Sequence, residues 1–350
     1  MRKFYLSFLA ILAISFSHAQ LTGIKTIPGD YATIALAIND LNTVGVGAGG
    51  VTFNVAAGHT ESTTSGIMLT ATGIAGNPII FQKSGAGANP NISRTDAGTN
   101  TTTTIGAMGD GIIKINGSDY VTFDGIDVNA SDQGIEYGYY IDKLSATNAS
   151  QNVTIKNAKV TMTKGTSAYV IGINISNGST SLSSATGVTV TAASGRSENI
   201  TLTGNTIENV HTGIYCRGSS ATGFYDQNFV IGATGAGNTI QNYGGGSNTT
   251  TYGIYFIYTE NVVTNDNMIS NAAAGGIPHG STIYGIMYST IIGSLESKNN
   301  NITLANSTTS GCHWIYNGSN TTTGTVISNN SFSGTITSTT TSYAIYNNNT

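Results

Sequence analysis

The chain has 350 residues, of which 9% are charged and 45 are glycine, and its formal net charge is −4. Soluble domains carry about 25% charged residues, so this chain lacks the Lys, Glu and Arg that would cover long amphipathic helices, and a helical bundle or coiled coil is disfavoured. The charge gives no basic surface for nucleic acid or anionic lipid, and 39% hydrophobic residues is too much apolar surface for a disordered chain.

Residues 1–19 have the pattern of a secretory signal peptide. Arg2 and Lys3 form a basic start, residues 4–16 are apolar apart from two serines, and Ala19 ends a small-residue cleavage site. The apolar run is too short to cross a bilayer comfortably. We therefore expect an exported protein, secreted or held at the cell surface, that does not insert into a membrane.

Residues 20–50 are expected to form an N-terminal cap that contains one short helix, over residues 31–41. Asp30, in a Pro-Gly-Asp turn, is the predicted N-cap. The apolar side chains follow a helical spacing of i, i+4 and i+7, at Ile34, Ile38 and Leu41.

The later part of the chain repeats about every 30 residues. One landmark is an Asn that lies two residues before an apolar side chain, at Asn205, Asn238, Asn267, Asn300 and Asn330. A second is an Ile followed by a large side chain, at Ile214, Ile254, Ile286, Ile315 and Ile345. Each repeat holds two or three short β-prone runs separated by Gly, Asn and Ser turns, and such a unit buries its apolar face only when repeats stack. The predicted fold is an all-β parallel β-helix over residues 51–350.

This register makes two further predictions. The stacked asparagines should hydrogen-bond to one another as a ladder along the axis. Cys216 and Cys312 should lie about three coils, or about 14 Å, apart, which is too far for a disulfide. We expect two free, mostly buried thiols.

The opening of the chain resembles a known group of proteins. The segment DYATIALAINDL followed by GGVTFNVAAGHTES is similar to the first coil of right-handed parallel β-helix proteins of the pectin lyase-like superfamily, and residues 75–93 and 110–128 resemble the next coils of its secreted bacterial members. The resemblance implies that the helix covers the end of a right-handed solenoid. Many such proteins, of the type IX-exported kind, continue into further modules, so we expect this chain to be truncated or capped by another segment after Thr350.

Catalytic members of that superfamily use acidic residues with a basic partner, and seven of the seventeen acids here lie within residues 110–142. Asp124 and Asp127 bracket the end of a predicted strand, where their oxygens could converge on Ca²⁺, and Lys114 precedes them as a candidate base. The alternative is that these aspartates cap turns. We expect the turn role, with catalysis or a structural Ca²⁺ as weaker hypotheses and no other cofactor.

Strand alternation predicts an aromatic face. If the repeated Ile side chains point inward, the next residue of each strand points outward. The predicted outward column is Tyr215, Tyr255, Met287, Tyr316 and Tyr346, with Trp314 on the same face. The same alternation places Tyr252, Tyr284, His313 and Tyr343 in the core. Exposed aromatic rings suit the C–H faces of sugars, although a packing ladder beneath a loop is the competing interpretation.

Three functions remain open at this point. The leading hypothesis is a secreted or cell-surface module, expected to be a monomer, that binds a polysaccharide or cell-surface glycan or acts in adhesion without catalysis. The alternative is a polysaccharide lyase or glycoside hydrolase acting on an acidic polysaccharide. The third is a passive structural stalk.

Overall fold

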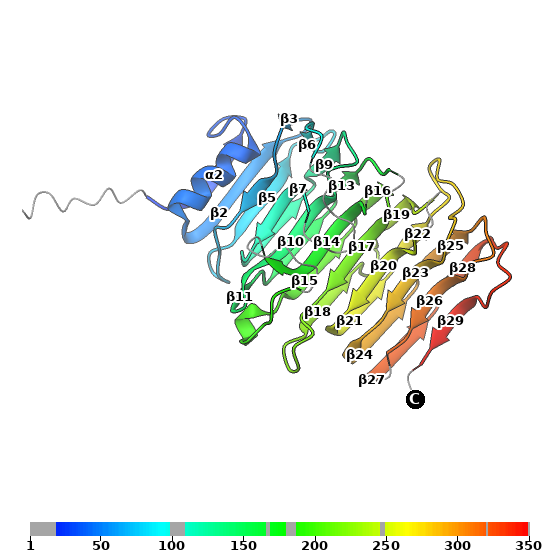
Figure 1. The fold of residues 1–350 in the computed structure, drawn as a ribbon. Coiled ribbons are helices and arrows are strands. Elements are labelled where there is room, and N and C mark those ends of the chain that lie inside the picture. Colours follow the sequence, from blue (N-terminus) through cyan, green and yellow to red (C-terminus); the bar gives the residue numbers. More distant parts are fainter. Residues whose placement is uncertain are drawn as a thin grey trace, which may run out of the picture.

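The computed structural model describes residues 19–98, 109–165, 169–179, 187–245, 249–319 and 321–348. The signal peptide predicted over residues 1–19 therefore lies, apart from its last residue, outside the described residues. The described chain winds into three parallel sheets, and successive strands follow one another along the axis from the N-terminal helix to the last strand (Figure 1). The predicted parallel β-helix is confirmed, with one strand per turn in each sheet.

The strands divide among three sheets that we call A, B and C. Sheet A contains β1 (Leu21–Ile27), β2 (Val46–Ala56), β5 (Ile79–Ser84), β8 (Val121–Asp124), β12 (Val153–Lys156), β15 (Glu198–Thr203), β18 (Asp226–Ile231), β21 (Thr259–Asn265), β24 (Ile291–Lys298) and β27 (Thr321–Ser328). Sheet B contains β3 (Thr60–Thr63), β6 (Asn91–Arg94), β9 (Asp127–Ala130), β13 (Lys159–Thr161), β16 (Thr206–Val210), β19 (Thr239–Tyr243), β22 (Met268–Ser270), β25 (Asn301–Ala305) and β28 (Ser331–Thr335). Sheet C contains β4 (Ile67–Leu69), β7 (Gly111–Asn116), β10 (Tyr137–Ser145), β14 (Ile171–Ser179), β17 (Thr212–Arg217), β20 (Thr251–Ile257), β23 (Ile283–Tyr288), β26 (Cys312–Asn317) and β29 (Tyr343–Asn347), with β11 (Asn148–Ala149) antiparallel to β10.

The core is a set of columns of like residues between the sheets. On sheet A, Phe53 stacks on Phe81 with ring centroids 4.4 Å apart, and Phe81 stacks on Phe123 at 5.1 Å. Parallel strands in register bring equivalent side chains of successive turns together, so a repeated sequence position becomes a continuous apolar column. The two cysteines are free and buried in this core, as the register predicts.

A ladder of asparagines, all buried except the half-buried Asn330, joins the turns between sheets A and B. In each step one side-chain amide donates to the Oδ1 of the next Asn and to a backbone carbonyl one turn away. The Nδ2–Oδ1 distances are 3.0, 3.0, 3.0 and 2.9 Å along the series Asn205, Asn238, Asn267, Asn300 and Asn330. The predicted ladder is confirmed, and it satisfies polar groups that would otherwise be buried without partners.

A second asparagine column lies at a bend near the start of the sheet A strands. Its members have a positive φ of 53° to 59°, a conformation that Asn tolerates better than most residues. Their side chains hydrogen-bond from turn to turn at 3.1, 3.2 and 3.3 Å along Asn152, Asn199, Asn228 and Asn261. In the next turn Gly293 takes the bend, with φ 70°. Part of the high Asn and Gly content is therefore used at this bend and in the ladder between sheets A and B.

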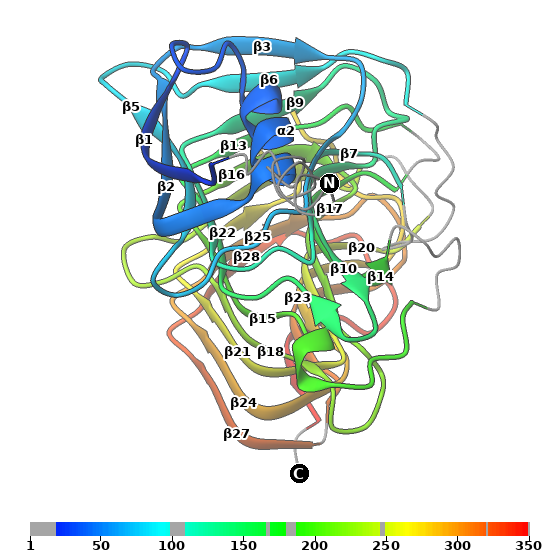
Figure 2. The same cartoon turned by 90° about the vertical axis from the view of Figure 1, so that its left-hand side faces the viewer.

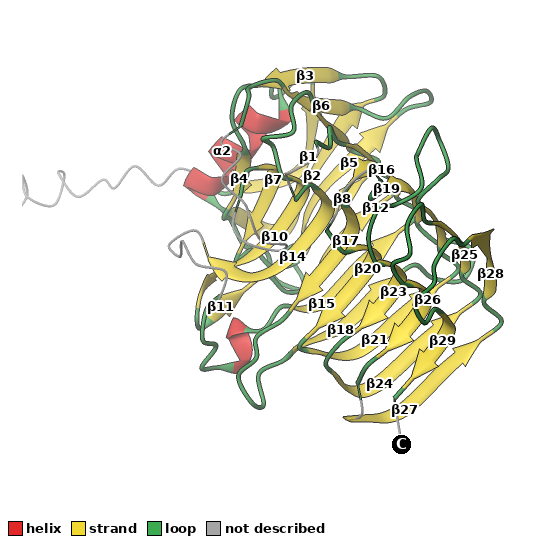
Figure 3. Ribbon diagram, turned by 45° about the vertical axis from the view of Figure 1, so that its right-hand side comes forward, coloured by secondary structure: helices red, strands yellow, loops and turns green. Residues whose placement is uncertain are grey.

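The helix α2 (Ile34–Val44) lies at the N-terminal end of the stack (Figures 2 and 3). It begins three residues later than predicted, because Asp30 accepts hydrogen bonds from Thr26 and closes a turn instead of capping the helix. The N-cap is Thr33, and Glu61 of β3 accepts from the Ile34 N–H at 2.6 Å. The only other described helical segment is a 3₁₀ turn at Ala193–Gly195. None of the helices in the described ranges is long and apolar enough to span a membrane.

Candidate functional site

The three residues that the sequence suggested for catalysis are not brought together. Asp124 ends β8 on sheet A and Asp127 begins β9 on sheet B, whereas Lys114 lies on β7 of sheet C. Asp124 pairs with the Lys156 Nζ at 3.1 Å, and Asp127 accepts from the Lys159 backbone N–H at 2.7 Å. Asp124 and Asp127 therefore hold the corner between two sheets, in the turn role that the sequence favoured.

Most of the acid-rich stretch has the same structural role. Six of its seven acidic side chains pair with a cation or accept a backbone N–H that would otherwise lack a partner: Asp110, Asp119, Asp124, Asp127, Asp132 and Glu136. The seventh, Asp142, is fully buried, and neither of its carboxylate oxygens has a hydrogen-bond partner among the described residues. Asp142 is the acid that the fold itself does not explain.

The outer face of sheet C carries a continuous column of side chains. Strand pairing aligns the following residues, one per turn from β4 to β29: Met68, Lys114, Tyr140, Asn174, Tyr215, Tyr255, Met287, Tyr316 and Tyr346. Five of these were predicted to form this column, and their alignment is confirmed. Tyr215 is only 3% exposed, so the exposed part begins at Tyr255.

A second aromatic column lies beside the first on the same face. Tyr252 stacks on Tyr255 at 4.4 Å and on Tyr284 at 5.3 Å. Tyr284 in turn contacts His313 at 4.8 Å, and His313 stacks on Tyr343 at 5.4 Å. The prediction that these four residues point into the core is wrong, although the neighbouring rings leave His313 itself only 7% exposed. We call the two columns together the aromatic array: Tyr252, Tyr255, Tyr284, Met287, His313, Tyr316, Tyr343 and Tyr346.

The error has a local cause at Gly253. A Cβ at Gly253 would lie 2.6 Å from the Ile269 side chain and 2.5 Å from the Gly285 carbonyl oxygen, so this position faces the interior. The next residue, Ile254, also belongs to the core. Two successive inward positions reverse the alternation, and Tyr252 therefore points outward with Tyr255.

Trp314 occupies the position that Gly253 and Gly285 hold in earlier turns. Its indole belongs to the core, is 6% exposed, and donates from Nε1 to the Ser333 carbonyl oxygen at 2.8 Å. The prediction that it shares the outward face is wrong for the same reason as for Tyr252. Trp314 is not part of the array.

At the N-terminal end of the array the same face becomes polar. Lys114 lies over the Tyr140 ring, with Nζ 4.9 Å from the ring centroid, and Asn174 is the cross-strand neighbour of Tyr140. Asp142 follows two residues after Tyr140 and therefore lies on the same face. We call Lys114, Tyr140, Asp142 and Asn174 the polar cluster.

The polar cluster contains several buried atoms without partners. In the part of the chain that the structure describes, the Tyr140 hydroxyl, both Asp142 oxygens and both polar atoms of the Asn174 amide make no hydrogen bond. Each such group costs about 1–3 kcal/mol. Burial raises the pKa of Asp142 to about 7, against the opposing effect of Lys114 and Lys143. A carboxyl group with such a pKa can act as a hydrogen-bond donor or acceptor near neutral pH.

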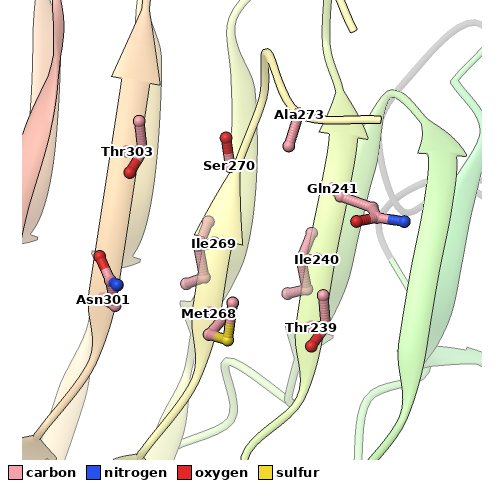
Figure 4. Close-up of a pocket in the computed structure, with 9 residues that line it drawn as sticks. All are labelled: Thr239, Ile240, Gln241, Met268, Ile269, Ser270, Ala273, Asn301 and Thr303. Atoms are coloured by element: carbon pink, nitrogen blue, oxygen red, sulfur yellow. The ribbon is translucent and has the colours of Figure 1, made fainter. Parts of the chain in front are cut away.

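A surface pocket lies on a different sheet of the solenoid. A pocket of about 80 Å³ over sheet B is lined by side chains of β19, β22 and β25 and by Ala273, and none of them is charged (Figure 4). Met268 reaches its surface and is 57% exposed. Within the described ranges, no group of three or more His, Cys, Asp or Glu side chains is arranged to hold a metal ion.

Sequence reasoning missed the polar cluster because its four residues come from three separate turns. Lys114 and Asp142 were noticed as part of a charged stretch, but nothing in the sequence aligned them with Asn174. The alignment requires the register of β7, β10 and β14, whose turns differ in length from the later repeats. The signal that could have found Asn174 is the repeat itself: one turn before Tyr255 lies Tyr215, and the equivalent position one turn before Tyr215 is Asn174.

Comparison with known proteins finds similarity to solved structures only, and at low sequence identity. No family model matches the chain, and no curated protein sequence does. Similar solved structures include an alginate lyase from Paenibacillus sp. (14% identity, 88% of this chain and 95% of that chain, TM-score 0.47). Others are a GH136 lacto-N-biosidase from Eubacterium ramulus (9%, 85% and 64%, 0.40) and the Streptococcus pneumoniae surface adhesin PfbA (15%, 94% and 98%, 0.40). The geometry of sheet C therefore carries the functional proposal.

Proposed function

We propose that this protein is an exported, non-catalytic module that binds a polysaccharide or cell-surface glycan along the outer face of sheet C. The observation that carries the proposal is the aromatic array, in which two columns of side chains, all rings except Met287, run side by side across four successive strands. The rings of Tyr255, Tyr284 and Tyr316 are partly exposed, whereas equivalent positions on the inner face are buried.

The chemistry of the array suits sugar rings. Sugars present C–H faces that pack on aromatic rings, with hydroxyl groups at their edges. Tyrosine supplies both a ring and a hydroxyl at low conformational cost, since it has only two side-chain torsions. Rings repeated at the strand spacing of about 4.8 Å offer a linear polymer several contacts in a row. Each contact is weak alone, but contacts on one chain act together.

The protonation states of the array side chains are suited to binding rather than to catalysis. Tyr252, Tyr284 and Tyr316 are not activated as nucleophiles or bases, because burial raises the pKa of each phenol. The pKa of His313 is lowered by burial, which leaves a neutral imidazole between two rings. The export signal predicted over residues 1–19 supports contact with extracellular glycans.

The test is binding to a defined oligosaccharide panel. The panel contains neutral hexasaccharides (cello-, xylo- and chitin-type) and acidic ones (galacturonate and mannuronate), measured by isothermal titration calorimetry with mature protein. We expect at least one member to bind, and the double variant Tyr255→Ala and Tyr284→Ala to bind it about tenfold or more weakly.

Tyr225→Ala is the matched control, because Tyr225 pairs with Tyr258 outside the array at 5.8 Å. This variant should bind as the wild-type protein does. Failure of the wild-type protein to bind any panel member would reject the proposal in favour of a structural stalk. Release of shorter or unsaturated sugars during the titration would indicate a lyase or hydrolase instead.

A further inference from the structure

Three side chains from three different turns meet at the corner where the chain passes from sheet C to sheet A. Lys143 lies near the end of β10, Ser197 immediately precedes β15, and Asp226 is the first residue of β18. The Lys143 Nζ lies 2.7 Å from Asp226 Oδ1, 3.0 Å from Asp226 Oδ2 and 3.3 Å from Ser197 Oγ. All three side chains are fully buried. The lysine therefore reaches along the axis to a carboxyl group two turns away.

An amine and a carboxyl group held in this way can condense to an amide. The two Asp226 oxygens are almost equally far from the Lys143 Nζ, so Nζ faces the carbon that joins them. Reacting atoms about 3–3.5 Å apart are in a near-attack geometry, and fixing two reactants in place is equivalent to an effective concentration of about 10⁵–10⁸ M. Because the pair is fully buried, bulk water does not compete for the carboxyl carbon.

The interior favours the neutral forms that the reaction needs. Only an unprotonated amine is nucleophilic, and a carboxylic acid is attacked more readily than a carboxylate. Burial lowers the pKa of Lys143 and raises the pKa of Asp226, against the attraction between the two groups. An ion pair in the interior carries the cost of two desolvated charges, whereas an amide carries no charge. Condensation therefore removes both buried charges at once.

Ser197 lies where it can move the protons. Its hydroxyl accepts from the Lys143 Nζ, and its backbone N–H and hydroxyl both hydrogen-bond to the Asp226 carboxyl group, where they oppose the rise in its pKa. The same donors would stabilise the negative charge that develops on an Asp226 oxygen as the amine attacks. The Ser197 hydroxyl thus connects the nitrogen that loses a proton with the oxygen that gains it.

We propose that Lys143 and Asp226 form an intramolecular amide bond, which joins sheet C to sheet A across two turns. In the reaction the Nζ lone pair attacks Cγ of the protonated carboxyl group, and a C–N bond forms while a C–O bond breaks. The released hydroxyl group leaves with one amine proton as water, by way of the Ser197 hydroxyl. The reaction needs no oxidant, reductant or second reactant. This inference is independent of glycan binding.

The bond would act along the direction in which a solenoid has few long-range contacts. Each turn of such a fold contacts only its neighbours, and both cysteines of the described chain are free. An amide between turns two apart would keep the turn between them in register. Like a disulfide, it would also restrict the unfolded chain, here over the 83 residues that separate Lys143 from Asp226.

The experiment measures the mass of intact, unfolded wild-type protein. Mass spectrometry of the mature chain should give a mass lower by one water than the sequence requires. Protease digestion should yield a branched peptide that joins Lys143 to Asp226, which distinguishes the amide from an aspartate that has lost water by closing to a cyclic imide. A mass equal to that of the sequence, both in fresh protein and after prolonged incubation in the folded state, overturns the proposal.

Lys143→Arg is the matched variant, because arginine keeps the positive charge but is always protonated and cannot attack. It should keep the full sequence mass, and a loss of water that persists in it overturns the proposal. Lys298→Arg is the control, since Lys298 lies 2.6 Å from Glu296 in a partly exposed pair, and it should lose water as wild type does. Ser197→Ala should slow bond formation about tenfold or more, and an unchanged rate overturns the proton relay.

Discussion

Asn267 is bonded on both sides within the interior ladder. Its Oδ1 accepts the backbone and side-chain N–H groups of Asn238, each at 3.0 Å, and its Nδ2 donates to Asn300 at 3.0 Å and to the Ile231 carbonyl at 2.8 Å. A single side chain therefore satisfies groups on the turns before and after its own. The ladder lies where the chain leaves sheet A for sheet B, so it stabilises the bend and the stacking together.

Asn267→Ala should destabilise the protein by about 2–4 kcal/mol, because the Asn238 backbone N–H and the Ile231 carbonyl lose a buried partner. The measurement is the urea midpoint followed by far-ultraviolet circular dichroism. Asn301→Ala is the control, since Asn301 is exposed on β25, and it should change stability by less than about 0.5 kcal/mol. Equal midpoints for the two variants would contradict the role of the ladder.

A buried ion pair joins sheets A and C. The Lys143 Nζ lies 2.7 Å from Asp226 Oδ1, and both side chains are fully buried. Lys143→Met should cost about 3–5 kcal/mol, because it leaves the Asp226 charge buried without its partner. The double variant Lys143→Met and Asp226→Leu should recover much of that loss. Thermal unfolding of both single variants and of the double variant gives the coupling free energy between the two side chains. If the losses in the free energy of unfolding of the single variants simply add in the double variant, the pair is not coupled.

Much of the architecture could be predicted from local sequence. The Asn205 and Asn238 spacing identified the repeat, and the free state of Cys216 followed from the same register. These features recur in every turn, so a wrong assignment in one repeat is revealed by the spacing of the neighbouring repeats. The start of α2 was less predictable, because Asp30 could cap a helix or close a turn, and its contact with Thr26 decides which.

The candidate site was predicted only in part. Alternation correctly aligned Tyr255 with Tyr316, but it failed for Tyr252 and Trp314, because two successive residues within each strand face inward and shift the phase. Such a shift depends on the backbone conformation within the strand, which strict alternation does not describe. Asp142 could not be distinguished from six neighbouring acids until their partners were known.

Trp314 gives a direct spectroscopic check on this correction, because it is the only tryptophan in the chain. A core indole should emit at short wavelength and be quenched poorly by iodide, and glycan binding on the array should leave its emission nearly unchanged. Strong iodide quenching in the native protein would show that the Trp314 indole is exposed on the outer face, and it would contradict the correction. Quenching of the urea-unfolded protein provides the reference for full exposure.

The two thiols should be unreactive until the protein unfolds. Cys216 and Cys312 are both fully buried, and burial raises the pKa of each thiol, that of Cys312 to about 12. The thiolate is the reactive form, so Ellman's reagent at pH 8 should detect almost no thiol in native protein and two thiols per chain in urea. A value near zero in urea without reductant would indicate a disulfide and would contradict the register.

Asp142 should make stability depend on pH in the direction opposite to an ordinary surface aspartate. Its pKa is raised to about 7 in the folded protein, chiefly by burial, so between about pH 4 and 7 the folded state holds a proton that the unfolded chain has released. Its contribution therefore favours folding at low pH and is lost as the pH rises toward 7. Asp142→Asn removes this dependence, and the variant should equal wild type near pH 4 and be more stable at pH 8 by up to about 4 kcal/mol.

The control for this prediction is Asp266→Asn, where the sign is reversed. The Gly235 backbone N–H and Asn299 lower the pKa of Asp266, so its ionised form favours folding above the unfolded pKa and this contribution is lost as the pH falls. The control variant should therefore be no more stable than wild type at pH 8. Urea unfolding at pH 4 and pH 8 measures both variants. An Asp142→Asn protein that is destabilised at pH 8 would mean that the carboxylate has a stabilising partner in the folded chain, and it would contradict the raised pKa.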